Sequence, residues 1–196
     1  MRTKITYWLI LFCISLSICC QDDKNEASIV LKKFLENSSN GNHFGWNGNF
    51  KDPVWLDATD YEDKVMDVRK KLNLPFQLVQ SDNAYYVLSY SLDSILLLND
   101  FAIGYTTLSS VSSGYCMGPL PIKKETIPKV YLLMKQHTKW FILSETNDWF
   151  ISVNTYIKWV DRLVSDPTYA SKFGKINDDV RNNYNSFKQF LLTNPK

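Results

Sequence analysis

The side chains that could carry out chemistry in this chain are few and scattered. Its two histidines are His43, in a Gly- and Asn-rich stretch, and His137, between two predicted strands. Cys116 is the only cysteine after residue 20, and the sequence places neither a general base nor an orienting partner beside it, both of which a nucleophilic cysteine needs. A zinc site needs three or four converging ligands, and no His/Cys cluster has that spacing. We therefore expect no catalytic set, no metal and no cofactor.

Four carboxylates in residues 57–63 are the nearest approach to a catalytic cluster: Asp57, Asp60, Glu62 and Asp63. Glycosidase chemistry needs two carboxyl groups set apart across a bond, and a calcium loop needs a glycine turn that is missing here. Negative side chains at the start of a helix stabilise it, which is the simpler interpretation. A hydrolase that uses Cys116 or the Asp57 to Asp63 carboxylates stays an alternative function.

Aromatic and amide side chains alternate in residues 41–55. Flat rings beside amides can stack on and hydrogen-bond a sugar or a peptide, although aromatic residues of a loop can equally be buried against a sheet. A second turn, at residues 147–150, has the same character. The predicted ligand-binding residues of the two segments are His43, Phe44, Trp46, Trp55 and Trp149.

The first twenty residues have the order of a secretory signal. Arg2 and Lys4 come first, residues 5–18 are mostly apolar, and the chain turns polar after Cys19 and Cys20. The apolar run is shorter than the roughly 20 residues of a membrane-spanning helix. Because cysteines stand at its end, the segment resembles a bacterial lipoprotein signal, in which the junction cysteine is lipidated and becomes the mature N-terminus.

That resemblance implies an organisation and a location. It predicts lipidation of Cys20, which follows a small residue, with Cys19 as the alternative because Leu16 stands three residues before it. Residues 1–19 would be the signal, 20–26 a tether and 27–196 a single globular domain. The protein would be lipid-anchored in the cell envelope, in the outer membrane at its periplasmic face or at the cell surface. A plain secreted protein and an uncleaved anchor helix are the alternatives.

The charge balance excludes one class of partner. Of the 22 Lys and Arg residues, Arg2 and Lys4 belong to the signal, which leaves 20 basic residues against 20 acidic ones. A nucleic-acid-binding domain carries a basic excess, so we expect no nucleic-acid partner. The remaining chain of about 176 residues suits one domain with a sizeable core.

Hydrophobic periodicity predicts helices, then strands, then helices. We expect helices at residues 26–37 and from residue 59 onward, and again at 153–164, with Ser152 as N-cap, and 177–192. In the middle, Tyr86, Leu88, Tyr90 and Leu92 alternate with other residues, which indicates a strand with one apolar face. More strands are expected at 94–98 and 101–108, and a hairpin at 130–145 with its turn at 136–138. This order predicts an α+β fold, an antiparallel sheet with two N-terminal and two C-terminal helices packed on it.

The strand pair at residues 130–142 also resembles the end of the nuclear-transport-factor-two-like fold. In small secreted proteins of that superfamily, the last strand carries a Trp two residues before an apolar position, as Trp140 and Ile142 do here. The resemblance covers residues 26–145 and implies a curved sheet that closes with helices around a pocket. It does not decide function, because the fold hosts both enzymes and binding proteins.

The sequence favours a non-enzymatic envelope lipoprotein that binds a glycan, peptide or protein ligand. The lipid anchor, the neutral domain, the loop aromatics and the lack of a catalytic set support this interpretation. An immunity or inhibitor protein that masks a toxin is the alternative from another class, because such proteins are also small and free of catalytic residues.

Overall fold

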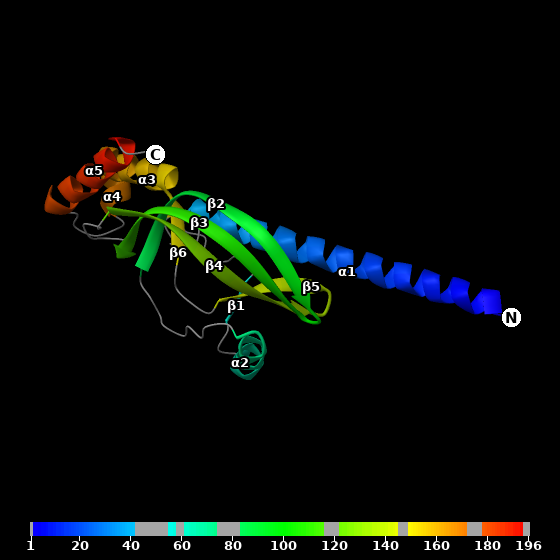
Figure 1. Ribbon diagram of the computed structural model, residues 1–196. Helices are drawn as coiled ribbons and strands as arrows, with labels where there is room; N and C mark the ends of the chain where they lie inside the picture. Colours follow the sequence, from blue (N-terminus) through cyan, green and yellow to red (C-terminus); the bar gives the residue numbers. More distant parts are fainter. Residues whose placement is uncertain are drawn as a thin grey trace.

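The computed structural model of the chain describes residues 2–41, 55–57, 61–73, 83–115, 122–144, 149–171 and 178–193. These residues form an α+β fold with a curled six-stranded sheet and helices packed on it, which confirms the predicted class (Figure 1). The strands are β1 (Trp55–Asp57), β2 (Asn83–Leu98), β3 (Phe101–Tyr115), β4 (Ile122–Gln136), β5 (Lys139–Ser144) and β6 (Trp149–Ser152). The helices are α1 (Arg2–Ser39), α2 (Glu62–Lys71), α3 (Val153–Ser165), α4 (Pro167–Ala170) and α5 (Asp178–Thr193).

The sheet is mixed, with the strand order β1-β5-β4-β3-β2-β6. The four central strands are antiparallel, as predicted, and a tight turn joins β2 to β3 and another joins β4 to β5: Asn99 (φ 52°) lies in the first and His137 (φ 56°) in the second. The edge strands β1 and β6 pair in parallel with β5 and β2. The prediction of a purely antiparallel sheet is therefore wrong. Each parallel pair joins strands that are far apart in sequence, so the long connection, and not a hairpin, sets their direction.

Along strand β2, the positions whose side chains point to a given face of the sheet change from odd to even residue numbers and back. Its pairing with β3 shifts register between Tyr86 and Val87, between Val87 and Ser89, and again after Leu92. Each extra residue of a bulge reverses the alternation of side chains. As a result Val87, Tyr90, Leu92, Ile95 and Leu97 all pack in the cluster under α1. The predicted single apolar face is wrong in part, because Tyr86 packs on the opposite face and the side chain of Leu88 is 39% exposed.

The second half of α1 covers one face of the sheet, which we call the inner face. Ala27, Leu31, Phe34 and Leu35 are buried at helical spacing on one side of α1. Their buried partners on the sheet are Val87, Ile95, Ala102, Leu108, Leu133, Trp140, Ile142 and Phe150. A Cβ added to Gly104 would lie 2.0 Å from Cδ2 of Leu31, so glycine at this position lets the helix approach the sheet closely.

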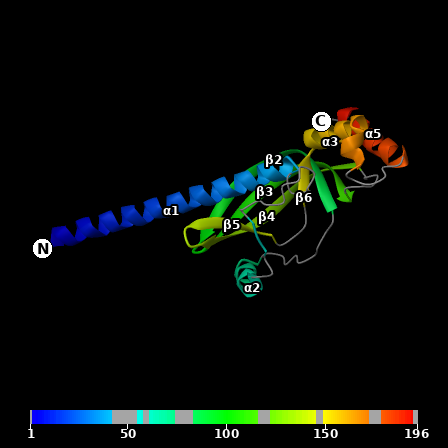
Figure 2. The same cartoon turned by 180° about the vertical axis from the view of Figure 1, so that it is seen from behind.

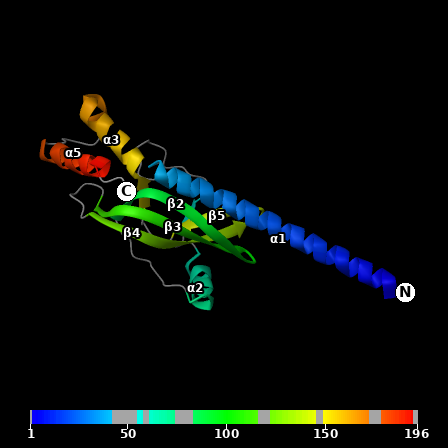
Figure 3. The same cartoon turned by 45° about the horizontal axis from the view of Figure 1, so that its top comes forward.

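The first half of α1 extends away from the sheet. Figure 1, Figure 2 and Figure 3 all show the N-terminal part of the helix projecting past the β2–β3 turn, on the side of the sheet away from α3 and α5. Residues 20–26, predicted as a tether, are helical and continue without interruption into the buried half of α1. Within the described ranges, no helix is long and apolar enough to cross a membrane.

The opposite, outer face is covered at its two ends. On β3, alternation places Ile103 and Tyr105 under α2 and Val111 under the C-terminal helices. Between these ends the described strands expose both apolar and polar side chains, among them Leu88, which is 39% exposed, and Asp93. Asp93 accepts hydrogen bonds from the hydroxyls of Ser91 and Thr107, each at 2.6 Å, and these bonds lower the pKa of the Asp93 carboxyl.

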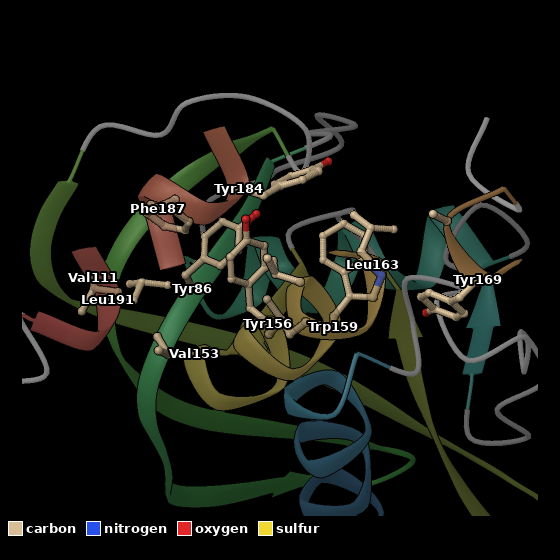
Figure 4. Close-up of a cluster of buried hydrophobic side chains, with 13 residues drawn as sticks. Tyr86, Val111, Val153, Tyr156, Trp159, Leu163, Tyr169, Tyr184, Phe187 and Leu191 are labelled. Atoms are coloured by element: carbon tan, nitrogen blue, oxygen red, sulfur yellow. The ribbon is translucent and has the colours of Figure 1, made fainter. Parts of the chain in front are cut away.

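The C-terminal helices bury a dense group of aromatic rings (Figure 4). Helix α3 begins as predicted at the N-cap Ser152, whose hydroxyl accepts a hydrogen bond from the backbone N–H of Thr155 at 3.1 Å. The helix contacts β2, β6, α4 and α5. The rings that meet edge to face or tilted, with centroids 4.9–6.4 Å apart, are Tyr86, Tyr156, Trp159, Tyr184 and Phe187. We call this group the C-terminal cluster.

Candidate functional site

The aromatic residues predicted to bind a ligand are not gathered at one place by the described part of the chain. His43, Phe44 and Trp46 lie outside the described residues. Trp55 begins β1 and pairs with Ile142, whereas Trp149 begins β6 and pairs with Ala84. Strands β1 and β6 are the two opposite edges of the sheet. Binding by this aromatic set stays a prediction.

The residues considered for catalysis lie on several elements or outside the described ranges. Asp57 ends β1, Asp63 lies exposed on α2, and Asp60 and Cys116 lie outside the described residues. His137 is exposed in the β4–β5 turn, where the sequence placed it. In the described ranges, no three His, Cys, Asp or Glu side chains are grouped so that they could hold a metal ion.

A cleft of about 510 Å³ lies between α2 and the β2–β3 turn. Its volume falls in the range of about 300–1,000 Å³ that is usual for small-molecule sites. Helix α2 forms one wall, and the end of the β2–β3 hairpin forms the other. The lining residues are Lys64, Asp67, Val68, Lys71, Leu72, Leu97, Leu98, Asn99, Asp100 and Phe101.

Helical spacing explains the α2 wall. Lys64, Asp67 and Lys71 recur at intervals of three and four residues, so they share one side of the helix. The ammonium of Lys71 lies 2.6 Å from a carboxylate oxygen of Asp67, and both side chains are more than half exposed. Val68 and Leu72, half-buried on the same helix, supply apolar surface to the lining of the cleft.

The opposite wall is held by β4. Asn99 takes the left-handed conformation that the tight β2–β3 turn requires, and Asp100 follows it. The backbone N–H of Lys135 donates a 2.7 Å hydrogen bond to the carbonyl of Asp100. Phe101 then begins β3 and packs beside Leu98 in the cluster under α2. The turn is therefore fixed relative to the sheet.

The last two residues of β4, Lys135 and Gln136, contact α1, the β2–β3 turn and the start of α2. We call these contacts the β4 junction. The Lys135 ammonium binds the Asp23 carboxylate of α1, and it lies 5.8 Å from the ring centroid of Trp140. The hydrogen bond to Asp23 raises the pKa of Lys135. The Gln136 amide donates to the hydroxyl of Tyr61, the residue before α2. The junction thus ties α1 to both walls of the cleft.

The cleft combines charged and apolar side chains. Its described lining carries two ammonium groups and two carboxylates, with no net charge, beside leucine, valine and phenylalanine side chains. A small amphipathic molecule that has both a positive and a negative group would match this arrangement. Sequence reasoning missed the site. The spacing of Lys64, Asp67 and Lys71 was visible, but nothing local to α2 pairs it with a turn that follows some 30 residues later.

Comparison with known proteins does not assign the chain to a family. No protein-family model, no curated protein and no solved structure matches the chain. The resemblances to bacterial lipoproteins and to the nuclear-transport-factor-two-like fold therefore stay predictions.

Proposed function

We propose that the protein is a non-enzymatic lipoprotein of a bacterial cell envelope, anchored in the outer membrane through a lipid on Cys20. Its domain binds a ligand in the cleft between α2 and the β2–β3 turn. Lipidation places several acyl chains on one residue, which is enough for stable anchoring without a spanning helix.

The observation that carries the proposal is the position of Cys20 in α1. The apolar run before it belongs to the half of the helix that projects beyond the sheet (Figure 1), whereas Asp23, three residues after Cys20, already binds Lys135 of the sheet. Cleavage before Cys20 would remove the projecting half and keep every buried residue from Ala27 onward. The junction cysteine thus stands at the border between a removable leader and the folded domain.

Metabolic labelling with a palmitate analogue in a Gram-negative host tests the anchor. We expect label and membrane fractionation in the natural protein and in Cys116→Ala, and loss of both in Cys20→Ala. Label that persists in Cys20→Ala but vanishes in Cys19→Ala would move the anchor by one residue. Absence of label from the natural protein would contradict the proposal.

Binding of zwitterionic amphiphiles tests the cleft, with short-chain phosphocholine and phosphoethanolamine lipids, glycans and peptides as probes. We expect Lys64→Glu, which makes the cleft net negative, to weaken binding of the phosphate-bearing probes at least tenfold. Lys70→Glu on the same helix, which does not line the cleft, is the control. Binding that is insensitive to Lys64→Glu but lost in Trp46→Ala or Trp55→Ala would place the site at the predicted aromatic residues.

The immunity or inhibitor function stays a prediction, and no contact in the described residues favours it over ligand binding. A hydrolase that uses Cys116 or the Asp57 to Asp63 carboxylates also stays a prediction. It would be supported by an activity that Cys116→Ala or Asp60→Asn abolishes.

A further inference from the structure

We infer that the anchored domain stands on the membrane with a fixed orientation, its β2–β3 turn, its β4–β5 turn and the cleft toward the bilayer and its C-terminal helices away from it. This inference rests on the proposed lipidation of Cys20. It adds the surface by which the domain meets lipid, and it replaces a flexible tether with a rigid support.

The helix itself is the first argument. Residues 20–39 belong to one uninterrupted α-helix, so the anchor and the core share a single rigid element. At a rise of 1.5 Å per residue, Cys20 precedes Asp23 by about 4.5 Å and the buried Ala27 by about 10 Å along the axis. The interfacial layer of a bilayer is itself roughly 5–8 Å thick on each side. The sheet therefore begins within about one layer thickness of the lipid surface.

The β4 junction is the second argument, because it decides which end of the sheet is near the lipid. Asp23, one helical turn after Cys20, binds Lys135 at the end of β4. Lys135 also holds Asp100 of the β2–β3 turn, and Gln136 holds Tyr61 before α2. Both turns and the cleft consequently lie at the anchor end, while α3 and α5 lie at the other end of the sheet (Figure 3).

Charge is the third argument, because it excludes an orientation in which α1 lies parallel to the membrane with its exposed side inserted in the bilayer. The exposed side of α1 carries Lys24, Lys32, Lys33 and Glu36, so this side cannot enter hydrocarbon without a large desolvation cost. The end that faces the membrane carries no excess of either sign in the cleft, where two lysines stand beside two aspartates. Such a surface fits zwitterionic phospholipid headgroups, which also lack a net charge.

Short-range quenching tests the orientation. The lipidated full-chain protein, in a Cys116→Ser background, is labelled with a fluorophore at Thr138→Cys in the β4–β5 turn or at Asn182→Cys on α5, both exposed positions. It is then reconstituted in phosphatidylcholine vesicles that contain headgroup-nitroxide phosphatidylcholine. We expect at least threefold stronger quenching at residue 138 than at residue 182. Equal quenching, or stronger quenching at residue 182, would overturn the inference.

A linker insertion separates orientation from anchoring. Ten Gly and Ser residues between Asp22 and Asp23 keep Cys20 and the domain but turn the rigid support into a flexible coil. We expect palmitate labelling to persist and quenching at residue 138 to fall toward the value at residue 182. Unchanged quenching would show that α1 does not set the orientation. A natural protein that takes up no lipid label would overturn the proposed anchor and the orientation together, whereas labelled protein with equal quenching would overturn the orientation alone.

Discussion

The two ends of the outer face are covered by helices in different ways. At one end, α3, α4 and α5 pack on the sheet through the C-terminal cluster, in which five aromatic rings contact one another and Leu163 is buried among its members. At the other end, α2 is the one helix of the described ranges that packs on the sheet, with Val65 as its buried apolar residue and Val68 and Leu72 half-buried. The cleft lies at this second end.

The difference lies in how much apolar surface the helices bury at each end of the sheet. Aromatic rings bury large areas and lock together, so the C-terminal end is filled. Helix α2 is mostly charged, and a short helix of that composition has too little apolar surface to fill the space between itself and the hairpin. The space that it leaves, lined by both charges and leucines, is what a ligand needs.

Truncation in the C-terminal cluster is expected to have the largest effect. Leu163 is 1% exposed, and Leu163→Ala should lower the free energy of unfolding by about 2–5 kcal/mol because it leaves a cavity in a packed core. Urea denaturation measures the change. The neighbouring Val164→Ala, at a side chain 38% exposed, should stay within about 0.5 kcal/mol. A loss below about 1 kcal/mol for Leu163→Ala would contradict the view of this end as the filled one.

Truncation under α2 should cost less. Val65 is 3% exposed, and Val65→Ala removes two methyl groups, for which we expect a loss of about 1–2 kcal/mol by the same measurement. Met66→Ala, at an exposed position one residue later, is the control. If Val65→Ala destabilised the protein as much as Leu163→Ala, the contrast between the two ends would be broken.

The β4 junction gives a smaller and pH-dependent effect. Lys135→Gln should lower stability at pH 7 by up to about 1 kcal/mol, the usual size for an ion pair that water reaches. The bond to Asp23 raises the folded-state pKa of Lys135, so the stabilisation is complete below the unfolded pKa of about 10.4 and is lost as pH rises through the folded value. Denaturation from pH 7 to 12 should show the variant and the natural protein converging, with the exposed Lys139→Gln as control. A difference that grows with pH would have the wrong sign.

The hydrogen bonds of Asp93, between the two ends of the outer face, should contribute least. Hydrogen bonds from Ser91 and Thr107 lower the pKa of Asp93, so its stabilisation is present above the unfolded value of about 3.9 and is lost as pH falls through the folded one. We expect Asp93→Asn to flatten the acid limb of the stability curve slightly, without moving the curve at pH 7 by as much as Val65→Ala does. Asp63→Asn on exposed α2 is the comparison, and an equal flattening there would refute the role of Asp93.

Local signals in the sequence predicted several elements correctly. The turn at His137 was predicted from its place between two apolar, strand-like segments. Ser152 caps α3, as expected for a serine directly before an apolar helical pattern, and the helical period of residues 153–164 predicted which side of that helix is buried. Each of these features depends on residues within one or two turns of the chain. Such features can be read without knowing the fold.

What the sequence could not show depends on partners far away in the chain. The bulges in the pairing of β2 with β3, which place Tyr86 in the opposite cluster and leave Leu88 exposed, have no signal in the local alternation of residues 85–92. The parallel edges arise from long connections, and the continuity of α1 through residues 20–26 overrides a composition that is typical of a tether. The cleft is a tertiary product of the same kind, since its two walls come from separate segments.

The burial of α1 against the inner face also sets an order of events in synthesis. The chain emerges with α1 first, yet the residues that cover Leu31 and Phe34 reach as far along the chain as Phe150 of β6. Strands β2 to β5 can pair as soon as each hairpin is made, because their partners are neighbours in sequence. The earliest segment is thus enclosed only after β6 has been made, and until then its apolar stripe must be shielded from other chains.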